Sequence, residues 1–225
     1  MASEAHVAGL MTGKAGILHI HMGDGKRGLE LVREALDTSE IPARVFNPTH
    51  INRNKTLFDE ALPLSLRGVR LDITAFPEGH SDPGWSAAEA FLRYRNGGYP
   101  ADKLTISSDG GGCLPHFNAE GELLRIGVGR SSTLVETLRE ILNSQVSHAS
   151  QVSHASQVSM TEALAPFTSN VADLLKLSHK GRLQQGKDAD MVVLDKQHTI
   201  RDVMARGRWH KRNGETQIFG TYEPS

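Results

Sequence analysis

The sequence predicts an α/β protein with a parallel sheet, followed by a small β-rich tail. Two observations support this fold class. In the first 143 residues, four short runs rich in β-branched residues are each followed by an amphipathic stretch, which is the pattern of βαβ units. After Gly181, the helical spacing gives way to short strand-like runs separated by turn residues. We therefore expect helices packed on a parallel sheet, with a smaller sheet appended.

The four predicted strands and their helices alternate along the chain. The strands are 15–21, 44–50, 69–74 and 103–109, and the helices are 26–38, 55–68, 85–98 and 132–143. In the first helix, apolar residues recur at helical spacing from Leu29 onward. Pro63 is expected to kink or shorten the second helix, because proline lacks the backbone N–H that a helix interior needs. Gly97 and Gly98 are the stop signal of the third.

A tandem repeat follows the fourth helix. It reads SQVSHA at 144–149, SQVSHA at 150–155 and SQVSMT at 156–161. Three such copies are too short and too polar to form a solenoid with its own core. We therefore predict that 144–161 is a surface loop, since lengthening a flexible loop costs little closure entropy.

Helix signals return after the repeat and then give way to strands. Ser159 and Glu162 form a capping box at the start of one short helix. Pro166 ends that helix, and Thr168, Ser169 or Asn170 caps the next one. The predicted tail strands are 191–195, 199–207 and 208–214, with turns at Gly207 and Asn213-Gly214. The expected domains are an α/β part over 1–178 and a small β part over 179–225.

The net charge, the cysteine content and the lack of long apolar runs indicate which partners and compartments are expected for this protein. The formal net charge is −1 at pH 7, which argues against nucleic acid or an anionic membrane as a partner. The single cysteine, Cys113, excludes an internal disulfide framework and fits a reducing compartment. No secretion signal is visible at the N-terminus, and no apolar run approaches the length of a membrane span. The expectation is a soluble, cytoplasmic protein.

Potential metal ligands gather at the carboxyl ends of the predicted strands. His21 ends the first strand, His50 the second and Asp109 the fourth. Active sites of parallel α/β proteins form at this edge. Two imidazoles and a carboxylate suit zinc or a similar metal. Arg53 lies just beyond His50, and an arginine fork suits bidentate capture of a carboxylate.

Each of these residues also has an ordinary structural explanation. A strand histidine is often a buried core residue, an aspartate before glycines often forms a turn, and Arg53 is also consistent with a surface charge. The glycines at 110–112 would let a substrate approach the backbone closely. The shared position at successive strand ends favours a site, because the ordinary explanations do not account for it.

Several motifs together resemble the isoaspartyl (β-aspartyl) dipeptidases, a family of metal-dependent amidohydrolases. They are HMGDGKRGLELV, PTHINRN, TISSDGGG, LRIGVG and the tail GRLQQGKDADMVVLD. The resemblance runs along nearly the whole chain, apart from the six-residue repeats. It implies a (β/α)8 barrel beside a small β-sandwich, two zinc ions at the barrel mouth, and cleavage of an isoaspartyl peptide bond. It also implies a homo-oligomer in the full-length family.

The resemblance assigns roles to individual residues. His21 and His50 match metal ligands after the fifth and sixth barrel strands. Asp109 matches the eighth-strand aspartate, which binds metal and shuttles the proton. Arg53 matches the arginine that holds a substrate carboxylate. Cys113 takes the place of a serine that also contacts the substrate, and a thiol is a weaker hydrogen-bond donor.

The same alignment implies that the chain corresponds to strands 5–8 of the barrel and part of the sandwich. His19 and His21 resemble the HxH pair of a first strand, but their context matches the fifth strand, so His19 is expected in the core. The first-strand HxH pair and the bridging carboxylated lysine are not found in this sequence. The implied function is therefore hydrolysis of isoaspartyl dipeptides by a chain that is N-terminally truncated. Two alternatives remain: a non-catalytic fragment or half of a split enzyme that needs a partner chain, and another amidohydrolase activity of the deacetylase or dihydropyrimidinase type.

Overall fold

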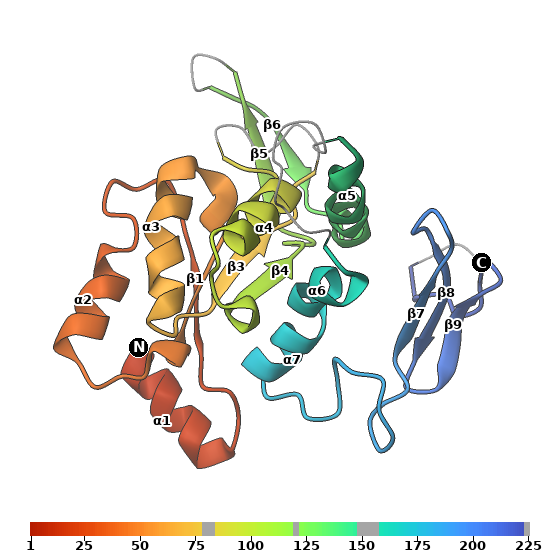
Figure 1. Ribbon diagram of the computed structural model, residues 1–225, viewed down its shortest axis with the longest axis horizontal. Helices are drawn as coiled ribbons and strands as arrows, with labels where there is room; N and C mark the ends of the chain where they lie inside the picture. The colour runs from red at the N-terminus through yellow and green to blue at the C-terminus, as the bar shows by residue number, and fades with distance from the viewer. Residues whose placement is uncertain (78–83, 119–121, 148–157, 223–225) are drawn as a thin grey trace.

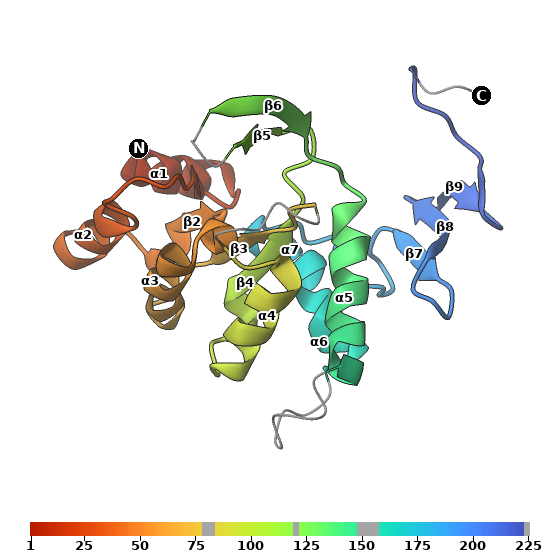
Figure 2. The same ribbon diagram turned by 90° about the horizontal axis from the view of Figure 1, so that it is seen from above.

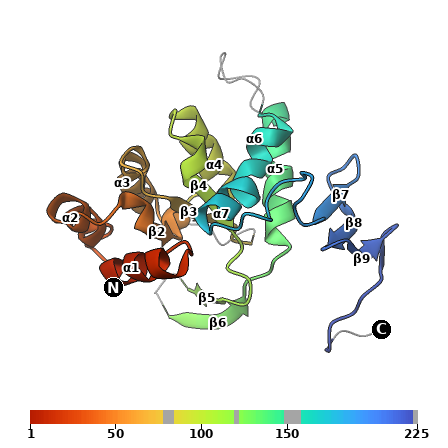
Figure 3. The same ribbon diagram turned by 90° about the horizontal axis from the view of Figure 1, so that it is seen from below.

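The computed structural model describes residues 1–77, 84–118, 122–147 and 158–222. Within these ranges the chain forms an α/β body and a small sheet beside it, toward the C-terminus (Figure 1). Helices α2 to α5 lie along one side of the central strands, while α1 and the β5–β6 hairpin lie on the opposite side (Figures 2 and 3). No helix in the described part of the chain combines the length and the apolar character that crossing a membrane requires.

The four predicted parallel strands are confirmed in position. They are β1 (Leu18–His21), β2 (Phe46–Thr49), β3 (Leu71–Thr74) and β4 (Leu104–Ser107). Strand β1 pairs in parallel with β2, and β3 pairs in parallel with β4. Strands β2 and β3 also lie side by side, since Arg70 N–H donates to Phe46 O at 3.3 Å. All four carboxyl ends therefore meet at one edge.

The predicted helices form after each strand, with small changes at their ends. They are α2 (Glu30–Thr38), α3 (Lys55–Leu66), α4 (Ala87–Asn96) and α5 (Thr133–Ser147), and α1 (Ala2–Thr12) precedes β1. Single turns of 3-10 helix precede β2, α3 and β4, at Ala43–Val45, Ile51–Arg53 and Ala101–Lys103. The stop signal of α4 is confirmed, because Gly97 is its C-cap and Gly98 has a φ of 73°.

Pro63 does not shorten helix α3, contrary to one of the two expected effects. The helix continues through Pro63 and ends at Leu66. Leu64 and Ser65 are buried, so tertiary packing holds this last turn in place. The Ser65 hydroxyl also donates to Leu62 O at 2.7 Å. Packing and this local bond offset the backbone hydrogen bond that proline cannot make.

The tandem repeat is not a loop along its whole length, which corrects the prediction for 144–161. Helix α5 continues to Ser147, and α6 (Met160–Leu164) begins within the third copy. Residues 143–147 contain no glycine or proline that would stop α5. The Ser159–Glu162 capping box is confirmed at the start of α6. The middle of the repeat, 148–157, lies outside the described residues.

A single 3-10 turn (Ala165–Phe167) and helix α7 (Ser169–Leu174) follow α6. Thr168 is the N-cap of α7, but no side chain makes the capping bond that we expected there. The Asn170 amide is used elsewhere: it donates to Ala101 O at 2.7 Å and to Leu104 O at 2.8 Å. Asn170 therefore anchors α7 to the start of β4.

The small C-terminal sheet is antiparallel, with strand order β10-β9-β8-β7. Its strands are β7 (Met191–Leu194), β8 (Ile200–Ala205), β9 (Arg208–Arg212) and β10 (Glu215–Thr216). The first three match the predicted tail strands. The antiparallel hairpin of β5 (Cys113–Phe117) and β6 (Leu123–Val128) was not predicted.

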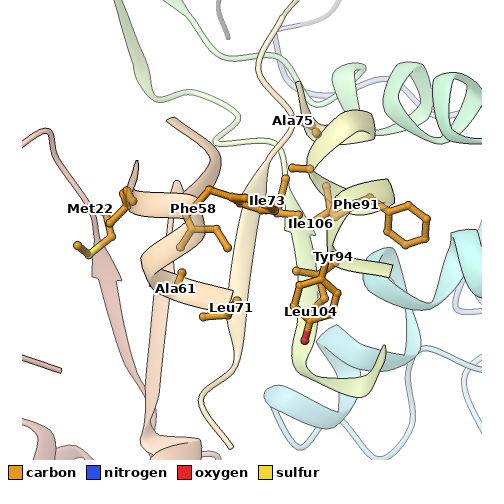
Figure 4. Close-up of a cluster of buried hydrophobic side chains, with 14 of the residues drawn as sticks. Met22, Phe58, Ala61, Leu71, Ile73, Ala75, Phe91, Tyr94, Leu104 and Ile106 are labelled. Atoms are coloured by element: carbon orange, nitrogen blue, oxygen red, sulfur yellow. The ribbon is translucent and has the colours of Figure 1, made fainter. Parts of the chain in front are cut away.

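The core lies between strands β3 and β4 and the helices that cover them. Leu71, Ile73, Leu104 and Ile106 project toward Phe58 and Ala61 of α3 and toward Phe91 and Tyr94 of α4 (Figure 4). These side chains are almost completely excluded from solvent. Since apolar burial is the dominant favourable contribution to folding, this cluster holds the strands at the spacing that the site needs.

The capping box of α4 gives a stability prediction. The Ser86 hydroxyl accepts from Glu89 N–H at 3.2 Å, and the Glu89 carboxylate accepts from Ser86 N–H at 3.0 Å. We expect Ser86→Ala to lower the free energy of unfolding by about 1 kcal/mol, because it leaves a helix N–H without its acceptor. Urea denaturation measures this change. The exposed Ser178 provides the control, Ser178→Ala, and equal stability of the two variants would contradict the assignment.

Candidate functional site

Two of the predicted ligands meet at the edge formed by the strand ends. His21 is the last residue of β1, and His50 follows β2 directly. His50 Nε2 lies 3.1 Å from His21 Nδ1, and the ring centroids are 5.0 Å apart. This contact arises because β1 and β2 pair in parallel with Thr49 opposite His21. The sequence-based grouping of these two histidines is therefore observed.

The His50 ring is held from its other side. Its Nδ1 lies 2.7 Å from the hydroxyl of Thr74, the last residue of β3. The backbone of His50 has a φ of 62°, in the left-handed region that residues with a side chain seldom adopt. Such conformations persist where the surrounding structure enforces them, and they concentrate at functional sites. The sequence analysis missed Thr74, although it ends the third strand at the same edge.

Electrostatics keep His50 neutral. Its side chain is 7% exposed. Burial lowers the pKa of His50 to about 4; Asp109 acts in the opposite direction, and His21 and Arg53 add to the lowering. At neutral pH the ring is therefore uncharged, and one of its two nitrogens carries a lone pair. A neutral imidazole is the form that binds a metal ion.

His19 is exposed, which corrects the expectation that it lies in the core. It shares one face of β1 with His21, and that face is open to solvent. Its Nδ1 lies 2.7 Å from the Asn47 side-chain oxygen, and its ring meets that of His21 at a centroid distance of 5.1 Å. Alternation along β1 places both histidines on the same side, and that side is not covered in this structure.

Asp109 lies two residues beyond β4, also with a positive φ of 48°. A side chain on Gly112 would place its Cβ 2.7 Å from the Asp109 carboxylate, and one on Gly129 would lie 2.2 Å from Asp109 O. These two glycines therefore leave room for Asp109. One of the glycines at 110–112 thus accommodates the aspartate, and the close approach of a substrate to this segment stays a prediction.

Arg53 is already engaged with a carboxylate. Its Nε and Nη2 donate to the two oxygens of Asp24 at 3.1 and 2.9 Å, and its Nη1 donates to Met22 O at 2.9 Å. Asn54 donates to Asp24 as well, at 3.0 Å. Burial raises the pKa of Asp24, but the bonds from Arg53 and Asn54 outweigh burial and leave this pKa lowered. The bidentate geometry expected of Arg53 is thus observed, with an internal partner that sequence reasoning missed.

Cys113 is exposed and begins strand β5, where it pairs with Val128 across the hairpin. The structure places it four residues after Asp109, at the base of the hairpin. Its contact with a substrate stays a prediction.

The donor set fits a metal ion in part. Zn–N bonds of about 2.0–2.1 Å put two nitrogens of a tetrahedral site roughly 3.3 Å apart, which is close to the 3.1 Å between His21 and His50. The separation of the two nitrogens is therefore compatible with two positions around one ion, and in this structure the same two nitrogens form a hydrogen bond between the rings. Among the described residues, however, no group of three His, Cys, Asp or Glu side chains lies close enough to hold a metal together. Asp109 is a candidate third donor, near enough to influence the pKa of His50.

Comparison with known proteins shows the family of the chain. The sequence profile of the Amidohydrolase family matches residues 13–213. The chain belongs to the amidohydrolase family.

Solved structures of β-aspartyl dipeptidase from Fervidobacterium islandicum AW-1 are similar to this chain. One, in complex with a β-Asp-Leu dipeptide, has a TM-score of 0.83 and 31% identity, and the match covers 98% of this chain and 54% of that one. A second has a TM-score of 0.79 and 28% identity, over 98% and 52% of the two chains. The chain thus spans about half the length of these two dipeptidase structures.

A more distant solved structure shares the fold alone. The zinc complex of the atrazine chlorohydrolase TrzN from Arthrobacter aurescens TC1 matches with a TM-score of 0.56 and 12% identity, over 98% of this chain and 49% of that one.

The environment of His50 makes its ionisation testable in the metal-free amidohydrolase chain. We expect the His50 ring to titrate near pH 4 by ¹H NMR. Because the pKa is lower in the folded than in the unfolded state, His50 contributes stability above about pH 6.5 that is lost as the pH falls toward 4. His50→Gln should therefore show a shallower loss of stability across this range. A His50 resonance that titrates near pH 6.5 would contradict this account.

Proposed function

We propose that the chain takes part in metal-dependent hydrolysis of β-aspartyl (isoaspartyl) dipeptides. The observation that carries this proposal is the His21–His50 contact at the shared strand edge, with Arg53 and Asp109 on the segments beside it. The similarity to a β-aspartyl dipeptidase solved with β-Asp-Leu supports the substrate class.

The architecture of the proposal is half of a (β/α)8 barrel. Strands β1 to β4 with their helices would be barrel strands 5–8, and the antiparallel sheet β7 to β10 would be part of a small sandwich, with the boundary at 178/179. The four parallel strands with helices on one side support this, since a barrel surrounds its strands with helices.

The chemistry would divide among residues of this chain. His21 and His50 would hold zinc, with Asp109 as a third donor, and zinc supplies Lewis-acid polarisation of the scissile carbonyl. The Asp109 carboxylate accepts a proton from the attacking water and delivers it to the leaving amine. His50 stays neutral at pH 7 and so keeps its donor nitrogen, while Thr74 fixes the orientation of its ring.

Arg53 would hold a carboxylate of the substrate. Its fork now binds Asp24 in the geometry that a substrate carboxylate would adopt. Substrate binding therefore exchanges one carboxylate for another on the same guanidinium. Asp24 lies between Gly23 and Gly25, and a Cβ on either glycine would meet no atom within 4 Å.

A second candidate function is that of one half of an enzyme whose site is completed by another chain. Two observations favour it: no group of three metal-binding side chains was found in the described residues, and the match spans 54% of the similar dipeptidase. In this case the purified chain would bind zinc weakly and would not hydrolyse β-Asp-Leu alone. A deacetylase or dihydropyrimidinase activity is tested by a panel of neutral amide substrates.

The catalytic assignment is tested with the purified chain, added zinc and β-Asp-Leu. We expect Asp109→Asn to lower the rate of hydrolysis by about 10²–10⁴-fold, because the amide cannot carry the proton. The exposed Asp59 of α3 supplies the control, and Asp59→Asn should keep the wild-type rate. Hydrolysis that Asp109→Asn leaves unchanged would refute the role of Asp109. Hydrolysis by neither protein would favour the half-enzyme alternative.

Substrate binding by Arg53 is tested by a change that keeps its charge. Lysine cannot donate two parallel hydrogen bonds to one carboxylate. We expect Arg53→Lys to raise KM for β-Asp-Leu by roughly 10–100-fold, the value of a charged hydrogen bond, with a smaller effect on kcat. Arg67→Lys is the control, because Arg67 binds Asp37 on the surface at 2.6 Å. An unchanged KM in Arg53→Lys would exclude Arg53 from substrate binding.

A further inference from the structure

A buried carboxylate at the centre of the strands has no part in the mechanism above. Asp72 of β3 is 3% exposed. It accepts three hydrogen bonds of 2.6 Å, from the hydroxyls of Thr49, Thr105 and Ser107. Burial raises the pKa of Asp72, and the three hydroxyls act in the opposite direction. This side chain therefore joins β3 to β2 on one side and to β4 on the other.

Two of the three bonds lead to the proposed site. Thr49 immediately precedes His50, and Ser107 is two residues before Asp109. Thr105 donates to the same carboxylate but lies further from the strand end, directly opposite Asp72 in the β3–β4 register. One side chain thus links the strand that carries His50 to the strand that carries Asp109.

Packing alone does not require a carboxylate here. Removing a charged group from water is costly unless hydrogen bonds replace the lost hydration, and apolar residues would fill the same space at lower cost. A carboxylate with three short hydrogen bonds does fix the directions of its partners, because each oxygen accepts along defined lone-pair directions. What Asp72 adds is geometric precision at the ends of β2 and β4.

We propose that Asp72 is a positioning residue that sets the spacing between His50 and Asp109 through Thr49 and Ser107. The inference rests on the proposed function, in which these two residues share one metal ion. Thr74, two residues along the same face of β3, orients the His50 ring, while Asp72 holds the strand ends on which both residues stand.

A matched pair of variants tests the proposal. Thr49→Val and Thr105→Val make the same chemical change at two buried residues, and each removes one 2.6 Å bond to the same carboxylate. We expect Thr49→Val and Asp72→Asn to weaken binding of Zn²⁺ by about tenfold, as measured by isothermal titration calorimetry, because supporting residues set ligand geometry. Thr105→Val should keep the wild-type affinity. Equal effects of the two valine variants, or wild-type affinity in Asp72→Asn, would overturn the proposal.

Hydrogen exchange of the metal-free chain gives a readout that does not depend on metal. Met22 N–H donates to Thr49 O, and Ala75 N–H donates to Ser107 O. Asp72→Asn should speed exchange at both amides, Thr49→Val at Met22, and Thr105→Val at neither. If the wild-type chain binds no Zn²⁺, the proposed function fails. The hydrogen-exchange rates of the Met22 and Ala75 amides then test by themselves whether Asp72 holds the ends of β2 and β4. Unchanged exchange at these amides in both Asp72→Asn and Thr49→Val would refute the positioning role of Asp72. If Asp72→Asn does not fold, the two valine variants decide.

Discussion

The parallel alignment of β1 to β4 is the constraint on which the candidate site depends. Parallel strands bring their carboxyl ends to one edge, so residues far apart in sequence become neighbours there. His21, His50 and Thr74 occupy successive strand ends, and the observed contacts run from His21 to His50 and from His50 to Thr74. The apolar cluster between the strands and helices α3 and α4 holds this edge in place (Figure 4). The positions of the polar site residues therefore depend on the packing of this apolar cluster.

Local signals predicted most of the elements, because strand runs, capping boxes and glycine stops act over a few residues. The hairpin of β5 and β6 escaped prediction because β5 contains Pro115 and His116 and shows no clean alternation. The exposure of His19 depends on what covers β1, which is a tertiary property. Among the site residues, His21 and His50 were found from their positions at strand ends. Asp24, Thr74 and Asp72 were missed because their roles arise from contacts between distant segments.

The charge states of His50 and Arg53 have different physical causes. Burial leaves His50 neutral, and Arg53 keeps its charge beside Asp24. The first arrangement leaves one ring nitrogen with a lone pair that can bind a metal ion. The second holds a guanidinium in an orientation fixed by Asp24 and Met22 O. A ligand therefore meets groups that are already oriented, which reduces the entropy lost on binding.

The Asp24–Arg53 pair also bears on which substrates fit the proposed function. A carboxylate that displaces Asp24 restores the bidentate bonds of Arg53, so the exchange costs little electrostatic energy. A neutral amide cannot accept both hydrogen bonds in this way, and displacing Asp24 would leave Arg53 without a counter-charge. The site would then distinguish acidic from neutral ligands in two ways. An acidic ligand gains the bidentate bonds to Arg53, and a neutral ligand leaves Arg53 unpaired, which weakens its binding. Under the proposed function, an acidic dipeptide therefore matches this arrangement better than a neutral amide does, because it would supply a carboxylate in place of Asp24.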